Sequence, residues 1–262
     1  MVARYGATDL GDGPNTKPLV IAHRGAPLEA PENTMAAFRL AAARGADMLE
    51  CDVQPTSDGT LVIMHDEDVR RTTDGRGPLR RLSLSEVRQL DAGSWFGPEF
   101  AGEAVPTLEE VCAFAAGRIL LNLEVKCPDA EFAELVDPFL ACLRRYDLLA
   151  TSIISSFDLA VLTRLRRHSP DARLAYLHHA IWVLPMREEL RLLKLTALHP
   201  HHALLTRRRL ERAHSFGLAV NAWTVDNPRR MARLCAWQAD GIITNDPGRL
   251  AALIRGGHPI PH

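Results

Sequence analysis

The chain has 262 residues, of which 47% are hydrophobic, so it is long enough to bury a sizeable core as one large domain or two smaller ones. The 31 basic and 32 acidic side chains give a formal net charge of −1, which provides no overall attraction to nucleic acid or to an anionic membrane. A partner that carries phosphate must therefore be recognised locally.

The N-terminal residues 1–17 are rich in Gly, Asp and Pro, and no apolar run in the sequence is long enough to span a membrane. We expect a flexible N-terminal arm, a cytoplasmic location and no stable insertion into a membrane. The five cysteines lie far apart without a CxxC pair, which predicts neither a zinc ribbon nor a disulfide framework and is typical of a reducing compartment.

Short apolar runs alternate with segments of helical period from about residue 19 onward, which is the pattern of repeated βα units. We expect eight strands, at Leu19–Ala22, Met48–Val53, Ile119–Val125, Ser152–Ser155, Leu174–Leu177, Ala197–His199, Leu218–Trp223 and Gly241–Thr244. Nothing marks an internal domain boundary. The pattern therefore predicts an α/β fold, a (β/α)₈ TIM barrel formed by residues 18–256 as a single domain.

Several expected helices begin with capping signals, in which a side chain accepts a hydrogen bond from a free amide of the first turn. The signals are Ser83 with Glu86, Thr107 with Glu110, Asn227 before Pro228, and Asp246 before Pro247. The first helix opens at Glu32-Asn33-Thr34, with Asn33 or Thr34 as its cap.

Residues 55–106 interrupt the alternation of strands and helices. They contain an extra strand-like run, Thr60–His65, followed by turn-rich sequence with the aromatic residues Trp95 and Phe96. A loop of this length in a compact domain is usually functional or disordered, and its aromatic residues and capped helix favour an ordered segment. We expect a small insertion at about residues 66–105, after the second strand, that caps the barrel mouth.

Acidic side chains stand at two strand ends, where the active sites of such barrels form. The second strand ends with Glu50 and Asp52, and the third with Glu124 and Lys126, so the two-residue period of a strand directs each pair to one face. Three carboxylates suit a hard divalent cation, Mg²⁺ or Ca²⁺. The alternative is a structural network in which Arg24 and Lys126 neutralise the acids, but two same-face pairs at strand ends favour the metal site.

Two histidines also stand at ends of apolar runs, His23 directly before Arg24 and His65 after the extra run. Singly, each is better explained as a hydrogen-bonded histidine of the rim. Beside a metal site they form a candidate acid/base pair, because phosphodiester cleavage needs one group to accept a proton and another to donate one to the leaving alkoxide. Trp223 lies at the seventh strand end, where simple packing explains it equally well.

Ten short motifs follow one another between residue 19 and about residue 250: His23-Arg24-Gly25, Pro31-Glu32-Asn33-Thr34, Glu50-Cys51-Asp52, Asp58-Gly59, His65-Asp66, Arg71-Thr72-Thr73, Gly93-Ser94, Val105-Pro106-Thr107-Leu108, Glu124-Val125-Lys126 and Trp223-Thr224-Val225. Each is weak alone. In this order and at these spacings they resemble the glycerophosphodiester phosphodiesterases, in particular the short cytosolic bacterial enzymes.

This resemblance implies a metal-dependent hydrolysis of glycerophosphodiesters, which are small-molecule substrates, to glycerol 3-phosphate and an alcohol. It implies the following roles: Glu50, Asp52 and Glu124 as metal ligands, His23 and His65 as general base and general acid, Arg24 and Lys126 on the phosphate, Trp223 on the glycerol side, and Glu32 orienting Arg24 or its neighbours. The segment from Asp66 to about Val105 matches the family's capping insertion, whereas residues 178–194 follow no family pattern.

Two other functions remain open. A phosphodiesterase of the lysophospholipase D type would need an apolar groove, for which Trp95, Phe96, Phe100 and Trp182 are candidates. A non-catalytic barrel that binds phosphorylated ligands should have lost a metal ligand or an imidazole, and all are present. The alcohol released, the metal used and the oligomeric state, with a homo-oligomer among the options, stay undetermined.

Overall fold

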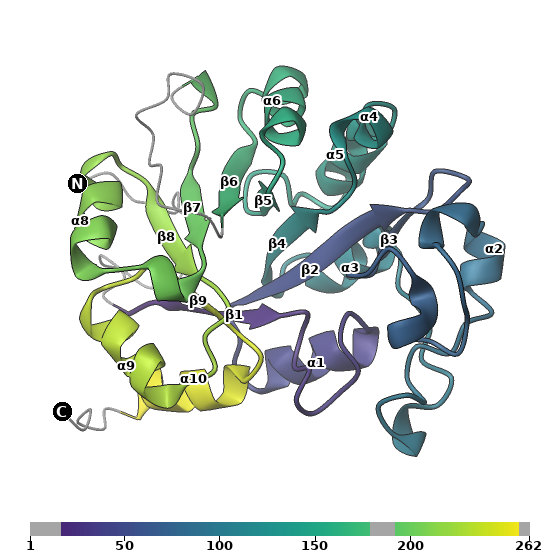
Figure 1. Ribbon diagram of the computed structural model, residues 1–262, viewed down its shortest axis with the longest axis horizontal. Coiled ribbons are helices and arrows are strands. Elements are labelled where there is room, and N and C mark those ends of the chain that lie inside the picture. The colour runs from purple at the N-terminus through teal and green to yellow at the C-terminus, as the bar shows by residue number, and fades with distance from the viewer. Residues whose placement is uncertain (1–16, 179–191, 257–262) are drawn as a thin grey trace.

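The computed structural model of the protein describes residues 17–178 and 192–256 and has a closed barrel of eight parallel strands at its centre (Figure 1). The strands are β1 (Leu19–His23), β2 (Met48–Pro55), β4 (Leu120–Val125), β5 (Ile153–Ser156), β6 (Arg173–His178), β7 (Ala197–Pro200), β8 (Ala219–Ala222) and β9 (Gly241–Thr244). The barrel closes because β1 pairs with β2 on one side and with β9 on the other. The predicted (β/α)₈ class and its eight strands are confirmed. The expected arm over residues 1–17 falls almost wholly outside the described residues, so it and the domain bounds 18–256 stay predictions.

Helices surround the barrel and face the outer side of the sheet. They are α1 (Met35–Ala43), α3 (Leu108–Ala115), α4 (Asp129–Phe132), α5 (Val136–Arg145), α6 (Leu159–His168), α8 (Arg207–Ser215), α9 (Pro228–Ala236) and α10 (Pro247–Arg255). The predicted caps are present, and at α1 the cap is Thr34, whose hydroxyl accepts from the Ala37 amide at 3.2 Å. Among the described residues, no helix is both long and apolar enough to cross a bilayer.

Alternation along the strands divides the core into two parts. Inward side chains such as Ile21, Met48 and Ile153 fill the interior of the barrel, and outward ones such as Cys51 and Leu121 pack against the helices. All of these side chains are buried. The apolar inward residues fill the part of the barrel toward the amino ends of the strands. The polar inward residues therefore lie at the carboxyl ends.

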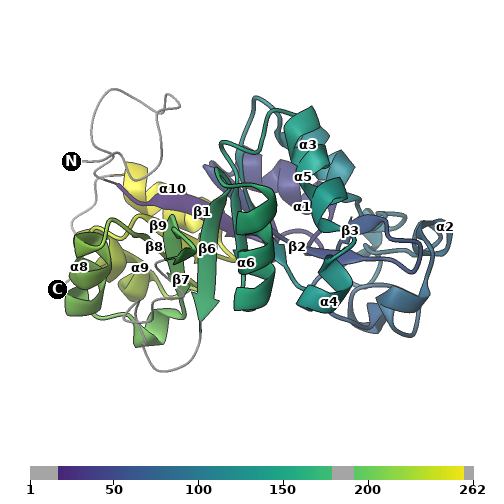
Figure 2. The same cartoon turned by 90° about the horizontal axis from the view of Figure 1, so that it is seen from above.

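The segment between β2 and α3, here called the cap, lies at one end of the molecule, with α8 and α9 at the opposite end (Figure 1 and Figure 2), and its covering of the barrel mouth stays a prediction. It consists of β3 (Leu61–Ile63), which runs antiparallel to β2, followed by η1 (Val69–Arg71), η2 (Leu79–Arg81), α2 (Leu84–Val87) and η3 (Pro98–Phe100). A small core of its own, separate from the barrel core, holds it together: Val62, Met64, Val69, Leu79, Val87, Ala92 and Val105. The cap is thus a local unit whose first residues lie beside the end of β2.

Candidate active site

The structure brings Glu50, Asp52 and Glu124 together at the carboxyl ends of β2 and β4. Asp52 and Glu124 are register partners on adjacent strands, and one carboxylate oxygen from each of the three acids lies within 4.8 Å of the others. Glu50 and Asp52 are buried, whereas Cys51 between them points into the helix-facing core. The alternation expected from the sequence therefore produces one compact group of carboxylates.

Two cations, Arg24 and Lys126, border this group, as the alternative of a structural network of charges predicted. The Arg24 guanidinium Nε lies 3.2 Å from Asp52 Oδ2, and Lys126 Nζ lies 3.2 Å from Glu124 Oε1. Among the described residues, the Glu50 carboxylate accepts one hydrogen bond, from the backbone amide of Arg24 at 3.0 Å. Two permanent cations thus face three carboxylates, and Arg24 is shared with a fourth, Glu32, at 2.9 Å.

The carboxylates are short of positive charge. Burial, together with the charges of Asp52 and Glu124, raises the pKa of Glu50 well above its ordinary value. Burial and the charge of Asp52 raise the pKa of Glu124 to about 7. Taking unpaired carboxylates out of water is costly, so a cluster with this deficit fits a cation better than it fits a purely structural role. Its three oxygen donors match the preference of Mg²⁺ and Ca²⁺.

The loop after β1 places Arg24 by an unusual backbone conformation. Arg24 has a φ of 55° and Gly25 a φ of 91°, both in the left-handed region. A Cβ on Gly25 would lie 2.8 Å from the backbone carbonyl carbon of Ala37, so only glycine fits against the first turn of α1. Strain of this kind gathers at functional sites, where it fixes the direction of a side chain.

His23 is held by an amide that is itself held by a carboxylate. The His23 Nδ1 lies 2.7 Å from Asn245 Oδ1, and Asn245 donates its Nδ2 to Asp226 Oδ2 at 2.7 Å. Because an ionised Asp226 only accepts, the amide nitrogen of Asn245 must face it and the amide oxygen must face His23. His23 then carries its proton on Nδ1, which leaves Nε2 as an acceptor.

Burial, with a further contribution from the charge of Arg24, lowers the pKa of His23 to about 4. The imidazole is therefore neutral at pH 7, and together with its fixed tautomer it has the properties of a base.

His65 has a different partner. Its Nδ1 lies 2.6 Å from Asp66 Oδ1, and Arg71 of the cap binds both Asp66 and Glu32, the latter with two bonds of 2.8 Å. The hydrogen bond from Arg71 lowers the pKa of Asp66 to about 2, so that carboxylate is anionic at neutral pH. Burial alone would raise the pKa of Glu32, but bonds and charge from Arg71 and Arg24 lower it to about 2. The expected contact of Glu32 with Arg24 is present, and it extends to the cap.

A pocket of about 250 Å³ lies at these strand ends and is lined by both histidines, both cations, Glu50 and Glu124. Phe157 and Trp223 line another part of it, with their rings edge to face at a centroid distance of 5.5 Å. The Trp223 ring is fixed by a bond from its Nε1 to the carbonyl of His199 at 2.6 Å. The pocket thus combines a charged part, suited to a phosphate, with an aromatic part.

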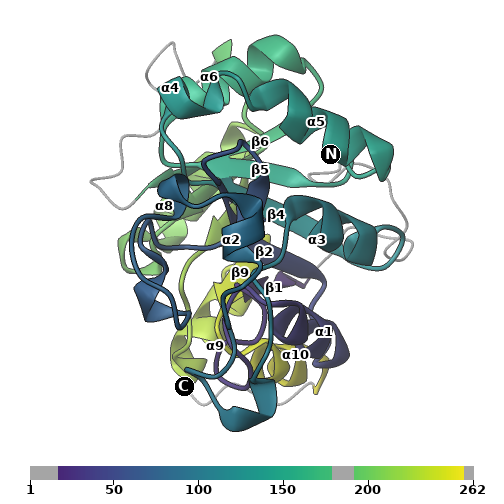
Figure 3. The same ribbon diagram turned by 90° about the vertical axis from the view of Figure 1, so that its right-hand side faces the viewer.

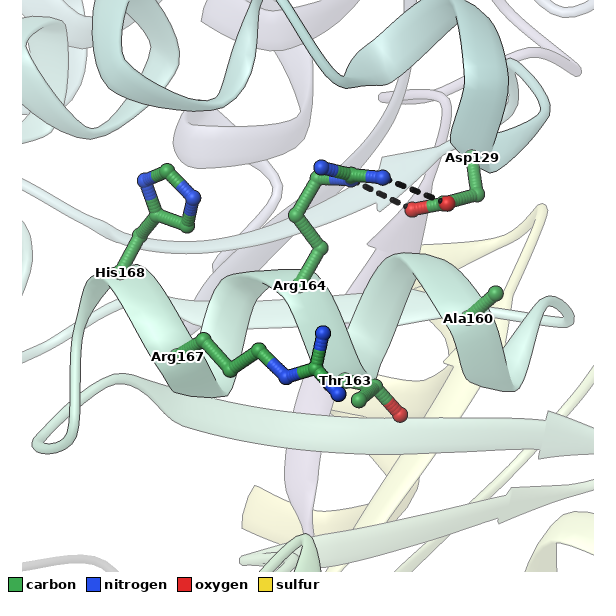
Figure 4. Close-up of a pocket in the computed structure, with 6 residues that line it drawn as sticks. All are labelled: Asp129, Ala160, Thr163, Arg164, Arg167 and His168. Atoms are coloured by element: carbon green, nitrogen blue, oxygen red, sulfur yellow. Dashed lines mark hydrogen bonds and ion pairs between the residues drawn. The ribbon is translucent and has the colours of Figure 1, made fainter.

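A larger cavity of about 360 Å³ lies outside the barrel, along α4 and α6 (Figure 4). Figure 4 shows Arg164 directed at Asp129, to which it makes two bonds of 2.6 and 2.7 Å. His168, at the other end of the cavity, is bonded to Asp137 at 2.8 Å. Since most of its charges are satisfied by neighbouring side chains, this cavity is an arginine-rich helix surface, and we assign it no chemistry.

The closed barrel places carboxylates, cations and two imidazoles around one pocket at its strand ends, which is an arrangement suited to a phosphoric diester hydrolase. Residues 23–249 match the model of the glycerophosphoryl diester phosphodiesterase family. The chain belongs to this family, as the motif series indicated.

Individual relatives agree with this assignment. The chain is 38% identical over 242 residues to a glycerophosphodiester phosphodiesterase of Caldanaerobacter subterraneus subsp. tengcongensis, covering 92% of this chain and 99% of that protein. It is similar to the structure of an Oleispira antarctica phosphodiesterase in complex with its product sn-glycerol-3-phosphate, with a TM-score of 0.85, 32% identity, and 91% and 97% of the two chains covered. It is also similar to a glycerophosphodiester phosphodiesterase from Agrobacterium tumefaciens, with a TM-score of 0.79, 29% identity, and 90% and 99% covered.

Sequence reasoning missed three residues of the site: Asn245, Asp226 and Phe157. Asn245 directly follows β9, and Asp226 lies shortly after β8. Polar residues after a strand are the signal that could have identified both, but each directly precedes a helix cap, Asp246 or Asn227, which explains the polar sequence locally. Asn33, considered only as a cap, instead donates its amide to Asp52 at 2.9 Å.

Proposed function

We propose that the chain hydrolyses glycerophosphodiesters to glycerol 3-phosphate and an alcohol, with His23 as general base and His65 as general acid. The observation that carries the proposal is the difference between the partners of two histidines that line one pocket. His23 is buried against an amide, whereas His65 is bound to an anionic carboxylate. Environments that differ in this way are how enzymes give acid and base roles to two groups of the same kind.

His23 is the residue suited to accept a proton from the attacking nucleophile. Its Nδ1 is occupied by Asn245, so Nε2 is the atom that takes the proton. His65 is bound through Nδ1 to Asp66, which leaves its Nε2 to protonate the departing alkoxide. As the general acid, His65 carries a proton on both ring nitrogens before it donates one, and the negative charge of Asp66 then lies next to the positive ring.

We further propose that Glu50, Asp52 and Glu124 hold the divalent cation, Mg²⁺ or Ca²⁺. A cation at this position supplies positive charge to the phosphate oxygens as negative charge accumulates on them. Arg24 and Lys126 line the same pocket and bind the phosphate directly. These two side chains also determine the orientation of the phosphorus relative to the histidines.

Trp223 is the proposed contact for the glycerol moiety, and Phe157 extends the same apolar surface. Glu32 orients Arg24 through the bond described above, and Arg71 holds Glu32 from the cap. Loss of Arg71 is therefore expected to disturb both the phosphate side and, through Asp66, the His65 side of the site.

The alternative lysophospholipase D activity has less support. Trp95, Phe96 and Phe100 form an edge-to-face aromatic group in the cap, but none of the three lines the pocket at the strand ends. Trp182, the fourth candidate for an apolar groove, lies outside the described residues. A non-catalytic barrel is disfavoured because every proposed ligand and both histidines are in place. The cytoplasmic location and the oligomeric state stay predictions.

The test is release of glycerol 3-phosphate from a panel of glycerophosphodiesters that differ in headgroup, with a lysophospholipid as the competing substrate. The protein is stripped with chelator and then supplied with Mg²⁺ or Ca²⁺. We expect glycerol 3-phosphate from the headgroup diesters with added metal and little turnover of the lysophospholipid. If no headgroup diester is cleaved with either metal, the proposal fails, and faster cleavage of the lysophospholipid would replace it with the alternative.

A further inference from the structure

Two cysteines that play no part in the site face each other behind the barrel. Cys112 lies on α3 and Cys142 on α5, and their thiols are close enough to influence one another's ionisation. The two helices are in contact and lie side by side in two views (Figure 2 and Figure 3). The chain has five cysteines, and all five are free thiols in the structure.

An ion pair next to the two cysteines also connects these helices. Glu109 lies three residues before Cys112 on α3, and Arg145 lies three residues after Cys142 on α5, so each charge shares a helix face with its cysteine. Arg145 Nη1 binds Glu109 Oε1 at 2.7 Å, and the Tyr146 hydroxyl donates to the same oxygen at 3.2 Å. The two helices are therefore joined by polar bonds on the same faces that carry the cysteines.

The two thiols differ in access. Cys112 is fully buried, whereas Cys142 is half-buried at the edge of the same core. The positive charge of Arg145 lies close to Cys142. The accessible Cys142 is thus the thiol that a peroxide in solution reaches first, with a second thiol beside it to react with its oxidised form.

We propose that Cys142 and Cys112 form a redox modification site, in which a hydroperoxide converts the two thiols into a disulfide between α5 and α3. The Cys142 thiolate attacks a peroxide oxygen, so that an S–O bond forms, the O–O bond breaks, and the departing oxygen leaves as water or an alcohol. The Cys112 sulfur then attacks the Cys142 sulfur, so that the S–S bond forms and the hydroxyl leaves as water with the Cys112 proton. Two thiols are oxidised and one peroxide is reduced.

The disulfide closes a chain segment that contains β4, the strand that carries Glu124 and Lys126. A disulfide that closes the segment from Cys112 to Cys142 restricts the unfolded chain more than the folded one, so the oxidised protein should be harder to unfold. A reversible thiol pair also agrees with the absence of a structural disulfide framework, because disulfides of reducing compartments are mostly transient. This inference does not depend on the proposed hydrolytic function.

The experiment exposes the purified full chain to hydrogen peroxide, blocks the remaining thiols, and identifies linked peptides by mass spectrometry without reduction. We expect a Cys112–Cys142 peptide, loss of two of the five titratable thiols, recovery of both with dithiothreitol, and a melting temperature higher by about 5 °C or more in the oxidised form. Cys112→Ser should instead accumulate a sulfenic acid at Cys142 that dimedone traps, and Cys142→Ser should form neither product.

Cys235→Ser is the matched control, since Cys235 is a partly exposed cysteine on α9, away from the pair, and its loss should leave the disulfide unchanged. The wild-type chain alone can overturn the proposal. It is wrong if oxidation leaves five free thiols, if it joins other cysteines or two chains, or if Cys142 reacts with peroxide no faster than Cys235.

Discussion

Replacing Asn245 with leucine should slow hydrolysis by removing the group that selects the tautomer of His23. Without the Asn245 oxygen, which lies 2.7 Å from Nδ1, the buried His23 Nδ1–H has lost its acceptor. Moving the proton to Nε2, or turning the ring, then becomes energetically more favourable than keeping the proton on Nδ1. Leaving a buried donor unsatisfied costs about 1–3 kcal/mol. Each 1.36 kcal/mol corresponds to tenfold in rate, so kcat/KM should fall by roughly 5- to 150-fold.

The assay compares a diester that has a poor alkoxide leaving group with a nitrophenyl diester. Removal of a proton from the nucleophile is needed in both reactions, so Asn245→Leu should slow both to a similar extent. Asn227→Ala is the control, because it deletes the cap of α9 next to Asp226 without touching His23. It should cost about 1 kcal/mol of stability and leave kcat/KM nearly unchanged.

Unchanged turnover of both diesters by Asn245→Leu would refute the tautomer argument. A loss confined to the alkyl diester would also contradict it, since that result would place Asn245 on the acid side of the reaction.

Three further predictions concern the metal, the histidines and the cap. Chelation should abolish activity, Mg²⁺ or Ca²⁺ should restore it, and Glu50→Gln should be inactive but folded by circular dichroism, because a ligand is lost. His65→Ala should lower kcat/KM by roughly 10²- to 10⁴-fold on the diester with the poor alkoxide leaving group and by much less on the nitrophenyl diester, whereas His23→Ala should be slow on both. The plot of wild-type kcat/KM against pH should be bell-shaped, with a fall at acid pH as His23 takes up a proton. Replacing residues 70–100 with a short Gly/Ser linker should leave a folded barrel, because the cap has its own core. Its substrate preference should change and its activity should fall, because Arg71 is removed together with its bonds to Glu32 and Asp66.

Each of these predictions has a result that contradicts it. Full turnover in chelator by protein without bound metal would eliminate the carboxylate site. Equal impairment of both histidine variants on both diesters would indicate that the histidines bind phosphate rather than exchange protons. Failure of the shortened chain to fold would mean that the cap belongs to the main core.

The sequence alone determined the barrel and its carboxylates, because both follow from local periodicity. Eight apolar runs with intervening helices predict eight strands, and two-residue alternation is enough to direct Glu50 and Asp52 to one face. The helix caps were equally local, since a cap and the amide that it binds are three residues apart. For these features the interacting groups are close in sequence or repeat at a fixed interval.

Only the tertiary structure shows the surroundings that support His23 as the proposed base, because contacts between distant segments form them. His23 and Asn245 are 222 residues apart and meet because the barrel closes with β1 beside β9. Arg71 reaches Glu32 from the cap across 39 residues. The charge, tautomer and orientation of an imidazole depend on burial and on its bonding partner, and local periodicity contains no information about either.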